Sequence, residues 1–198
     1  MNEGKSVLAS LIIDEAKKFQ DITVVYFYCR FGDPDRNEFL PIARSLLLQL
    51  LMQDESLLLF FESTMSTLGD QGILSKLDSA LQLLKTALNS RKTYVILDGI
   101  DECGRDQRKH VCTWFREVVD SLHHRNQDEI RCLFIGQDDG IARKDLSMLP
   151  VITISPSSNL EDITIFTRQW QVRIEERFGP LQNDGLDLTK IVPARSQG

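Results

Sequence analysis

The sequence has little of what disulfide frameworks and zinc sites require. It contains four cysteines and three histidines in 198 residues. The cysteines form no closely spaced pair, and the histidines do not stand at ligand spacing from them. We therefore expect reduced thiols, with Cys29 and Cys132 serving as small apolar residues in strands.

Long apolar runs and a basic excess are also missing. Residues 57–61 form an apolar run of only five residues, far below the roughly 20 that span a bilayer. An acidic and a basic residue interrupt the first apolar stretch, which argues against a signal peptide. The formal net charge of −6 argues against binding to nucleic acid or anionic membranes, because both need a positive surface. These absences predict a cytoplasmic protein.

What the sequence does contain is an alternation of helical and strand patterns. Runs of β-branched, aromatic and aliphatic residues predict strands, and apolar residues at helical spacing predict helices. The strands are expected at residues 22–29, 93–97, 130–135 and 151–154. The helices are expected at residues 6–19, 39–51, 74–88, 107–122 and 156–178, with a shorter one within 54–72. This order predicts a three-layer α/β/α fold, in which helices flank both faces of a mostly parallel sheet.

The first pattern with chemical meaning is Gly4-Lys5-Ser6, which opens the first expected helix. A helix N-terminus offers free backbone N–H groups and a partial positive charge to an anion. Lys5 would bring a charge to phosphates, and Ser6 would bring a hydroxyl ligand to Mg²⁺. Alone the triplet is weak evidence, because a serine near a helix start is usually a cap.

The second pattern is an acidic cluster behind an apolar strand. The strand runs into Asp98, and Asp101 and Glu102 follow it closely. Ligands of parallel α/β sheets bind at the carboxyl ends of the strands, where this cluster is expected to lie. Asp98 could hold Mg²⁺, while Asp101 and Glu102 could polarise an attacking water or complete the metal shell. Together, the two patterns predict a phosphoryl-transfer site of the P-loop type.

Through residues 4–6 and 94–102 the chain resembles the NACHT-type P-loop NTPases of the signal-transduction (STAND) class. Residues 24–36 and 43–46 resemble the nephrocystin-like N-terminal version of that domain. That version is abundant in fungal proteins that also carry ankyrin or tetratricopeptide repeats. The resemblance implies a nucleotide-operated regulatory switch that binds ATP and Mg²⁺ and contacts other protein domains or further copies of itself.

The resemblance also implies roles for individual residues. The implied nucleotide-binding positions are Gly4, Lys5, Ser6, Asp98 and Gln137. The implied metal ligands are Ser6 and Asp98, and the implied catalytic residues are Asp101 and Glu102.

Two departures from the family pattern point to impaired hydrolysis. A complete phosphate loop has a glycine five residues before Gly4, whereas the sequence begins only three residues before it. We therefore expect the front of the loop to be missing. The family also often places an arginine that senses the γ-phosphate after the strand matching residues 131–135. Here that place holds Gln137, which can donate a hydrogen bond but carries no charge.

Two other functions stay open on the sequence alone. A non-catalytic protein-interaction module would keep the fold and bind no nucleotide. A small P-loop kinase would need an acceptor site and arginines, for which Arg30, Arg36 and Arg44 are candidates. For the chain as a whole we expect an NTPase core over residues 1–155, a trailing helix over 156–178, and a linker or tail over 179–198.

Overall fold

The computed structural model describes residues 3–68, 74–122, 130–137, 140, 144, 146, 149–154, 160–180 and 187–195. The chain divides into two compact units, Met1–Ser147 and Met148–Gly198. Each unit is described by itself below.

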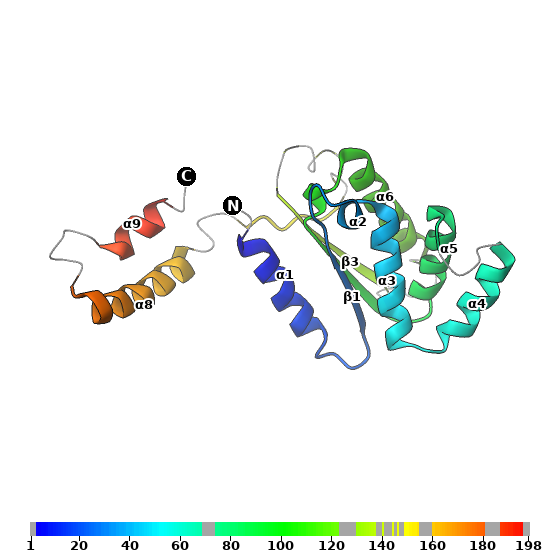
Figure 1. The fold of residues 1–198 in the computed structure, drawn as a ribbon, viewed down its shortest axis with the longest axis horizontal. Helices are drawn as coiled ribbons and strands as arrows, with labels where there is room; N and C mark the ends of the chain where they lie inside the picture. Colours follow the sequence, from blue (N-terminus) through cyan, green and yellow to red (C-terminus); the bar gives the residue numbers. More distant parts are fainter. Residues whose placement is uncertain are drawn as a thin grey trace. The chain divides into compact units, whose positions relative to one another are not determined.

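The first unit alternates helices and strands around a sheet (Figure 1). Its strands are β1 (Thr23–Tyr28), β2 (Thr93–Asp98) and β3 (Ile130–Ile135). Its helices are α1 (Glu3–Ala16), α2 (Pro34–Asn37), α3 (Phe39–Gln53), α4 (Leu57–Leu68), α5 (Leu77–Leu88), the 3-10 helix η1 (Ile100–Glu102) and α6 (Arg105–Leu122). Apart from α2 and η1, which the periodicity did not predict, these bounds lie within a few residues of the predicted ones.

The three strands form one parallel sheet in the order β1-β2-β3. Their register places Val25 beside Val95, and Val95 beside Cys132. Parallel neighbours cannot be joined by a tight turn, so each connection crosses over through helices. The expected α/β fold with a parallel sheet flanked by helices is therefore confirmed.

Helices cover both faces of this sheet. Successive residues of a strand point to opposite faces, so each strand contributes apolar side chains to both. Val25 and Val95 lie in the larger core cluster, together with buried residues of α3, α5 and α6. Val24 and Ile96 lie in a smaller cluster with Ile13 of α1. Figure 1 shows α1 on one side of the sheet and α3, α5 and α6 on the other. Burial on both faces explains why the strands are nearly continuous apolar runs.

Side chains of α3 cover the outer edge of β1. The Gln49 side chain accepts a hydrogen bond from Tyr26 N–H (3.0 Å) and donates one to Tyr26 C=O (2.8 Å). Gln53 donates to Val24 C=O at 3.1 Å. These amides pair with backbone groups that a further strand would otherwise use, which protects the edge from adding another chain.

The second unit contains α8 (Leu160–Phe178) and α9 (Leu188–Arg195), which pack against each other. The strand predicted at residues 151–154 is wrong, since these residues are irregular. Val151 and Ile152 are 70% and 89% exposed, so this short apolar run has neither a pairing strand nor a core to cover it.

Helix α9 lies within the stretch expected to be a linker or tail. The Asp187 carboxylate accepts hydrogen bonds from the N–H and hydroxyl of Thr189 (3.1 and 2.5 Å), which satisfies donors at the start of this helix. Among the described helices, none has the length and apolar character needed to cross a lipid bilayer.

Candidate functional site

The carboxyl end of the sheet brings the start of α1 to the end of β2. The last residues of the three strands, Tyr28, Asp98 and Ile135, are in register, so the strands end together. The Ser6 hydroxyl on the first turn of α1 donates a hydrogen bond of 2.5 Å to Asp98 Oδ2. Two segments that are 92 residues apart in sequence therefore share one contact.

Asp98 is a buried carboxylate, only 4% exposed, at the exit of the central strand. Burying a charge is costly unless hydrogen bonds or an ion compensate it. Ser6 supplies one such hydrogen bond to the carboxylate, and the Asp98 backbone C=O separately accepts a hydrogen bond from Cys29 N–H at 2.8 Å. The strand thus holds Asp98 firmly at the edge where ligands of parallel sheets bind.

A tight turn after Asp98 positions the remaining carboxylates. Gly99 has φ +73°, in the left-handed region, and a Cβ there would lie 3.0 Å from the carbonyl oxygen of Cys29. Only glycine meets both conditions without strain. Ile100, 2% exposed, anchors η1 in the core, and Glu102 N–H bonds back to Gly99 C=O at 2.8 Å. The turn therefore holds Asp101 beside the end of the strand.

Lys5 and Asp101 face each other, but each keeps a polar atom without a hydrogen-bond partner. Lys5 Nζ lies 3.9 Å from Asp101 Oδ2, and the two side chains are 27% and 11% exposed. Both Lys5 Nζ and Asp101 Oδ1 are buried and have no hydrogen-bond partner. A buried polar atom left unpaired costs about 1–3 kcal/mol, and more when it is charged. Such atoms are rare in native proteins, and a binding site is one reason to retain them.

The end of β3 closes the site from another side. A Cβ on Gly136 would lie 2.9 Å from Asp101 Oδ1 and 3.2 Å from Ile100 Cγ2, so a side chain there would push the Asp101 carboxylate aside. Gln137 follows immediately, with an exposed side chain. Gly136 is a site residue that the sequence did not single out, although its place directly after an apolar strand is a recognisable signal.

The two adjacent carboxylates of the turn are used differently. Glu102 Oε2 accepts a hydrogen bond of 2.9 Å from Phe31 N–H, which ties the loop after β1 to η1. Asp101 instead keeps an unpaired oxygen next to Lys5. From the sequence alone, Asp101 and Glu102 had the same candidate roles, and only the geometry of the turn distinguishes them.

The structure thus brings together four residues of the predicted set, which we call the Lys5 cluster: Lys5, Ser6, Asp98 and Asp101. Gly4 lies in the same first turn of α1, and a Cβ there would meet nothing within 4 Å. Among the described residues, no group of three or more His, Cys, Asp or Glu could by itself hold a metal ion. Asp98 and Ser6 offer two oxygen ligands, and Mg²⁺ is commonly held by few protein ligands plus phosphates and waters.

Two of the three arginines considered for a kinase acceptor site make contacts of their own. Arg36 pairs with Asp33 at 3.7 Å, within the turn at α2. Arg44 Nε donates a hydrogen bond of 2.6 Å to Leu74 C=O. Arg30 is exposed. These contacts engage Arg36 and Arg44 away from the Lys5 cluster.

All four cysteines are free, as expected. The sequence did not predict that Cys29 and Cys103 would influence each other's pKa. The Cys29 thiol donates a hydrogen bond to Cys103, which together with burial raises the pKa of Cys29. The same bond and the charge of Arg108 lower the pKa of Cys103 despite its burial.

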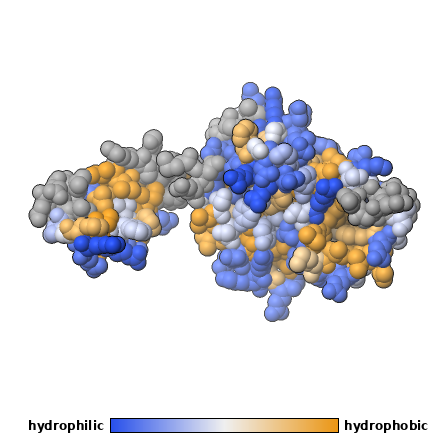
Figure 2. Space-filling model, in the orientation of Figure 1, coloured by the Kyte–Doolittle hydropathy of each residue, from blue (hydrophilic) through white to orange (hydrophobic). Residues whose placement is uncertain are grey.

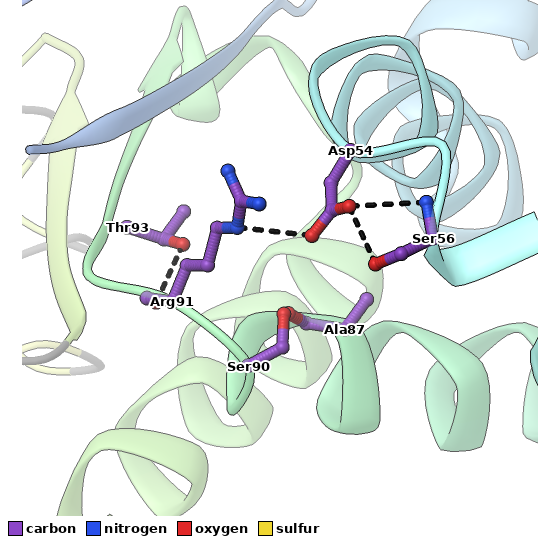
Figure 3. A network of polar contacts seen from close by, with 6 residues as sticks. All are labelled: Asp54, Ser56, Ala87, Ser90, Arg91 and Thr93. Carbon is purple, nitrogen blue, oxygen red and sulfur yellow. Dashed lines mark hydrogen bonds and ion pairs between the residues drawn. The ribbon is translucent and has the colours of Figure 1, made fainter. Parts of the chain in front are cut away.

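The amino end of the sheet holds a polar network of a different kind (Figure 3). Asp54, just after α3, accepts hydrogen bonds from the N–H and hydroxyl of Ser56 at 3.1 and 2.6 Å. Its other oxygen lies 2.9 Å from Arg91 Nε. The hydrogen bond from the Ser56 hydroxyl is the largest of the causes that lower the pKa of Asp54. Thr93, at the start of β2, donates to the Arg91 carbonyl at 2.9 Å.

Comparison with known proteins supplies the family. A family model described as nephrocystin 3, N-terminal, matches residues 2–136, more than half of the 198. The match runs from α1 through β3 and includes both halves of the cluster and Gly136. No curated protein and no solved structure matches the chain. On the strength of this match, the chain belongs to the nephrocystin 3 N-terminal family.

Proposed function

We propose that the Lys5 cluster binds the phosphates of a nucleotide, with ATP expected from the NACHT resemblance, and that this unit is the nucleotide-binding regulatory module of a signalling NTPase. One observation carries the proposal. Lys5 Nζ is buried beside Asp101 without a hydrogen-bond acceptor. A phosphate oxygen is the acceptor that a lysine at the start of a helix would take.

The residues around Lys5 fit a phosphate with its Mg²⁺. Free N–H groups of the first turn of α1 point out of its N-terminus, and the open space at Gly4 leaves room for an anion. Ser6 Oγ and Asp98 Oδ2 would hold the Mg²⁺, which would neutralise charge on the phosphates. Gln137 would donate a hydrogen bond at the open side of the site.

Weak hydrolysis fits the same residues. Asp101 is the better candidate to orient a water, because one of its carboxylate oxygens is unpaired, whereas Glu102 is engaged by Phe31. Glu102 then acts as a positioning residue for the turn. The charged groups named in the cluster are one lysine and two aspartates, so added positive charge for a transition state would have to come from elsewhere.

Binding is tested first by thermal unfolding with and without ATP and Mg²⁺, using wild type, Lys5→Met and a matched control, Lys18→Met. Lys18 lies two residues after the end of α1, and its ammonium pairs with exposed Glu15. A ligand at a hundredfold excess over Kd stabilises the native state by about 2.7 kcal/mol. We expect this shift in wild type and Lys18→Met, and its loss in Lys5→Met. Equal shifts in all three proteins would contradict the proposal.

A non-catalytic interaction module is the second candidate. Exposed apolar side chains on α3 and α4 favour it, including Leu48, Met52 and Leu59 at 58%, 76% and 75% exposure. Figure 2 shows apolar surface over this corner of the first unit. If millimolar ATP leaves the unfolding of a well-folded wild type unchanged, this second function replaces the first.

A further inference from the structure

Helix α8 exposes aromatic side chains and buries polar ones. Phe166 and Trp170 are 60% and 46% exposed, and their ring centroids lie 6.0 Å apart on the surface. The residues of α8 that are buried are Thr167 and Gln171. An amphipathic helix of a self-contained unit normally buries its apolar stripe. An exposed aromatic patch bordered by polar residues is instead typical of a surface that contacts another protein.

The second unit leaves these rings uncovered. Its other described helix, α9, has eight residues, and Val192 on it is 40% exposed. Among the described residues, the two hydrophobic core clusters contain none from this unit. The buried Gln171 amide donates to Glu175 at 3.0 Å, while its oxygen has no hydrogen-bond partner. A partner that covered Phe166 and Trp170 would therefore remove apolar surface that this unit leaves in water.

The charges on the aromatic side of α8 change sign along the helix. Asp162, Phe166, Trp170, Arg173 and Arg177 follow one another at intervals of three or four residues, which places them on one face. All five are exposed, and we call them the α8 face. Asp162 lies in the first turn and Arg177 in the last, and the Arg173 guanidinium lies 5.7 Å from the centre of the Trp170 ring. The α8 face therefore begins negative, is aromatic in its middle, and ends positive.

We propose that the α8 face is the interface of a homodimer, in which α8 of one copy packs antiparallel against α8 of a second copy. The family match ends at residue 136, and the proposed nucleotide site lies in the first unit, so neither involves this helix. Complementary charge identifies the occupant, because the two ends of the face carry opposite signs and fit each other when one copy is reversed.

An antiparallel arrangement matches the residues of the α8 face with suitable partners. Asp162 and Arg177 lie equally far in sequence from the middle of the face, and so do Phe166 and Arg173. Pairing about that middle sets Asp162 against Arg177 of the second copy, and Phe166 against Arg173 of the second copy. Carboxylate and guanidinium form charge-assisted hydrogen bonds, and a guanidinium stacks on an aromatic ring. Arg177 also lies 5.5 Å from the Phe178 ring centroid, a contact with the ring face that leaves N–H donors for a carboxylate.

A parallel arrangement would not fit. It would set Asp162 against Asp162 of the second copy and each arginine against its own equivalent, and like charges at one contact repel. In the antiparallel pair the same patch serves on both copies, so the assembly closes at two. Exposed ion pairs contribute little affinity, so the rings supply most of it, while the charges fix the direction.

Sedimentation velocity of the full chain over a wide concentration range tests the proposal. Wild type should show a monomer–dimer equilibrium, and Trp170→Ala should raise its dissociation constant at least about tenfold, because a ring at the centre of the interface is lost. The charge variants test the register. Asp162→Arg and Arg177→Asp should each shift the equilibrium towards monomer. The two changes together should restore the dimer, because opposite charges again face each other with their signs exchanged.

Matched controls are Glu161→Arg, in the same first turn, and Arg168→Asp. Both residues are exposed, and helical spacing places them off the α8 face. These variants should leave the dissociation constant unchanged, and circular dichroism should show the same helix content in every protein. A wild type that stays monomeric at every concentration would overturn the proposal. So would a dimer that persists in Trp170→Ala and in both single reversals, or a double reversal that dissociates as readily as the single ones.

Discussion

The two ends of strand β2 carry ionic clusters that are built in opposite ways. At the amino end, Asp54 uses both carboxylate oxygens, one on Ser56 and one on Arg91 at 2.9 Å (Figure 3). At the carboxyl end, Lys5 and Asp101 stand 3.9 Å apart, and each keeps a buried atom without a hydrogen-bond partner. The two clusters are separated by a single strand of six residues.

This contrast is what we propose distinguishes a structural cluster from a binding one. A satisfied network stabilises the fold and has no capacity left for a ligand. An unsatisfied one destabilises the free protein, and it persists where a ligand supplies the missing partners. Each end pairs a cation with a carboxylate, and the count of satisfied atoms separates the two ends.

The largest expected effect is on the turn that presents Asp101. Gly99→Ala should lower the free energy of unfolding by about 2–3 kcal/mol, because φ +73° penalises a Cβ and that Cβ would crowd the Cys29 carbonyl at 3.0 Å. Gly32→Ala is the control, since φ is +75° there but nothing lies within 4 Å. Urea unfolding should give the control the smaller loss, of about 1–2 kcal/mol. Equal losses would show that the contact with Cys29 is unimportant.

The amino-end network comes next. Asp54→Ala should lower Tm by a few degrees, because it removes the bonds to Ser56 and leaves Arg91 without its partner. Glu15→Ala, which breaks the exposed pair with Lys18, should leave Tm unchanged in the same calorimetric scan. An Asp54→Ala protein with the Tm of the wild type would show that the network at the amino end does not stabilise the fold.

Lys5→Met should not share this loss of stability. Without ligand, its free energy of unfolding should be unchanged or raised by up to about 1 kcal/mol, because a buried ammonium with no hydrogen-bond partner is replaced by an apolar chain. Arg91→Met, at the satisfied end, should lower it. Chemical denaturation of both variants measures the comparison directly, and a marked loss in Lys5→Met would mean that the ion pair with Asp101 stabilises the fold.

The smallest effect is a pH dependence. The Ser56 hydrogen bonds and Arg91 hold the pKa of Asp54 below its usual value. A depressed carboxyl pKa stabilises the native state above the unfolded pKa of about 3.9, and this contribution is lost as pH falls through the folded pKa. Asp54→Asn should therefore flatten the fall of Tm between about pH 5 and the acid limit. An identical acid profile in wild type and variant would assign that slope to other carboxylates.

Local pattern predicted most of the first unit because its elements bury continuous or periodic apolar faces. The strand ending at Asp98 and the helix carrying Phe39, Ile42 and Leu46 were recognisable for this reason. The failures occurred where local pattern conflicts with tertiary context. Residues 151–154 have strand composition but no pairing partner, and α9 follows a polar stretch whose Asp187 capping contact was overlooked.

By itself, the sequence determined the parallel α/β fold, the placement of Ser6 on a first helical turn, and the placement of Asp98 at a strand exit. These follow from periodicity and from short-range turn chemistry, which act within a few residues. Only the tertiary structure decided that Lys5 faces Asp101 and that Glu102 is tied to Phe31. Those contacts join segments that approach one another only when the sheet assembles, and the register of strands far apart in sequence sets their geometry.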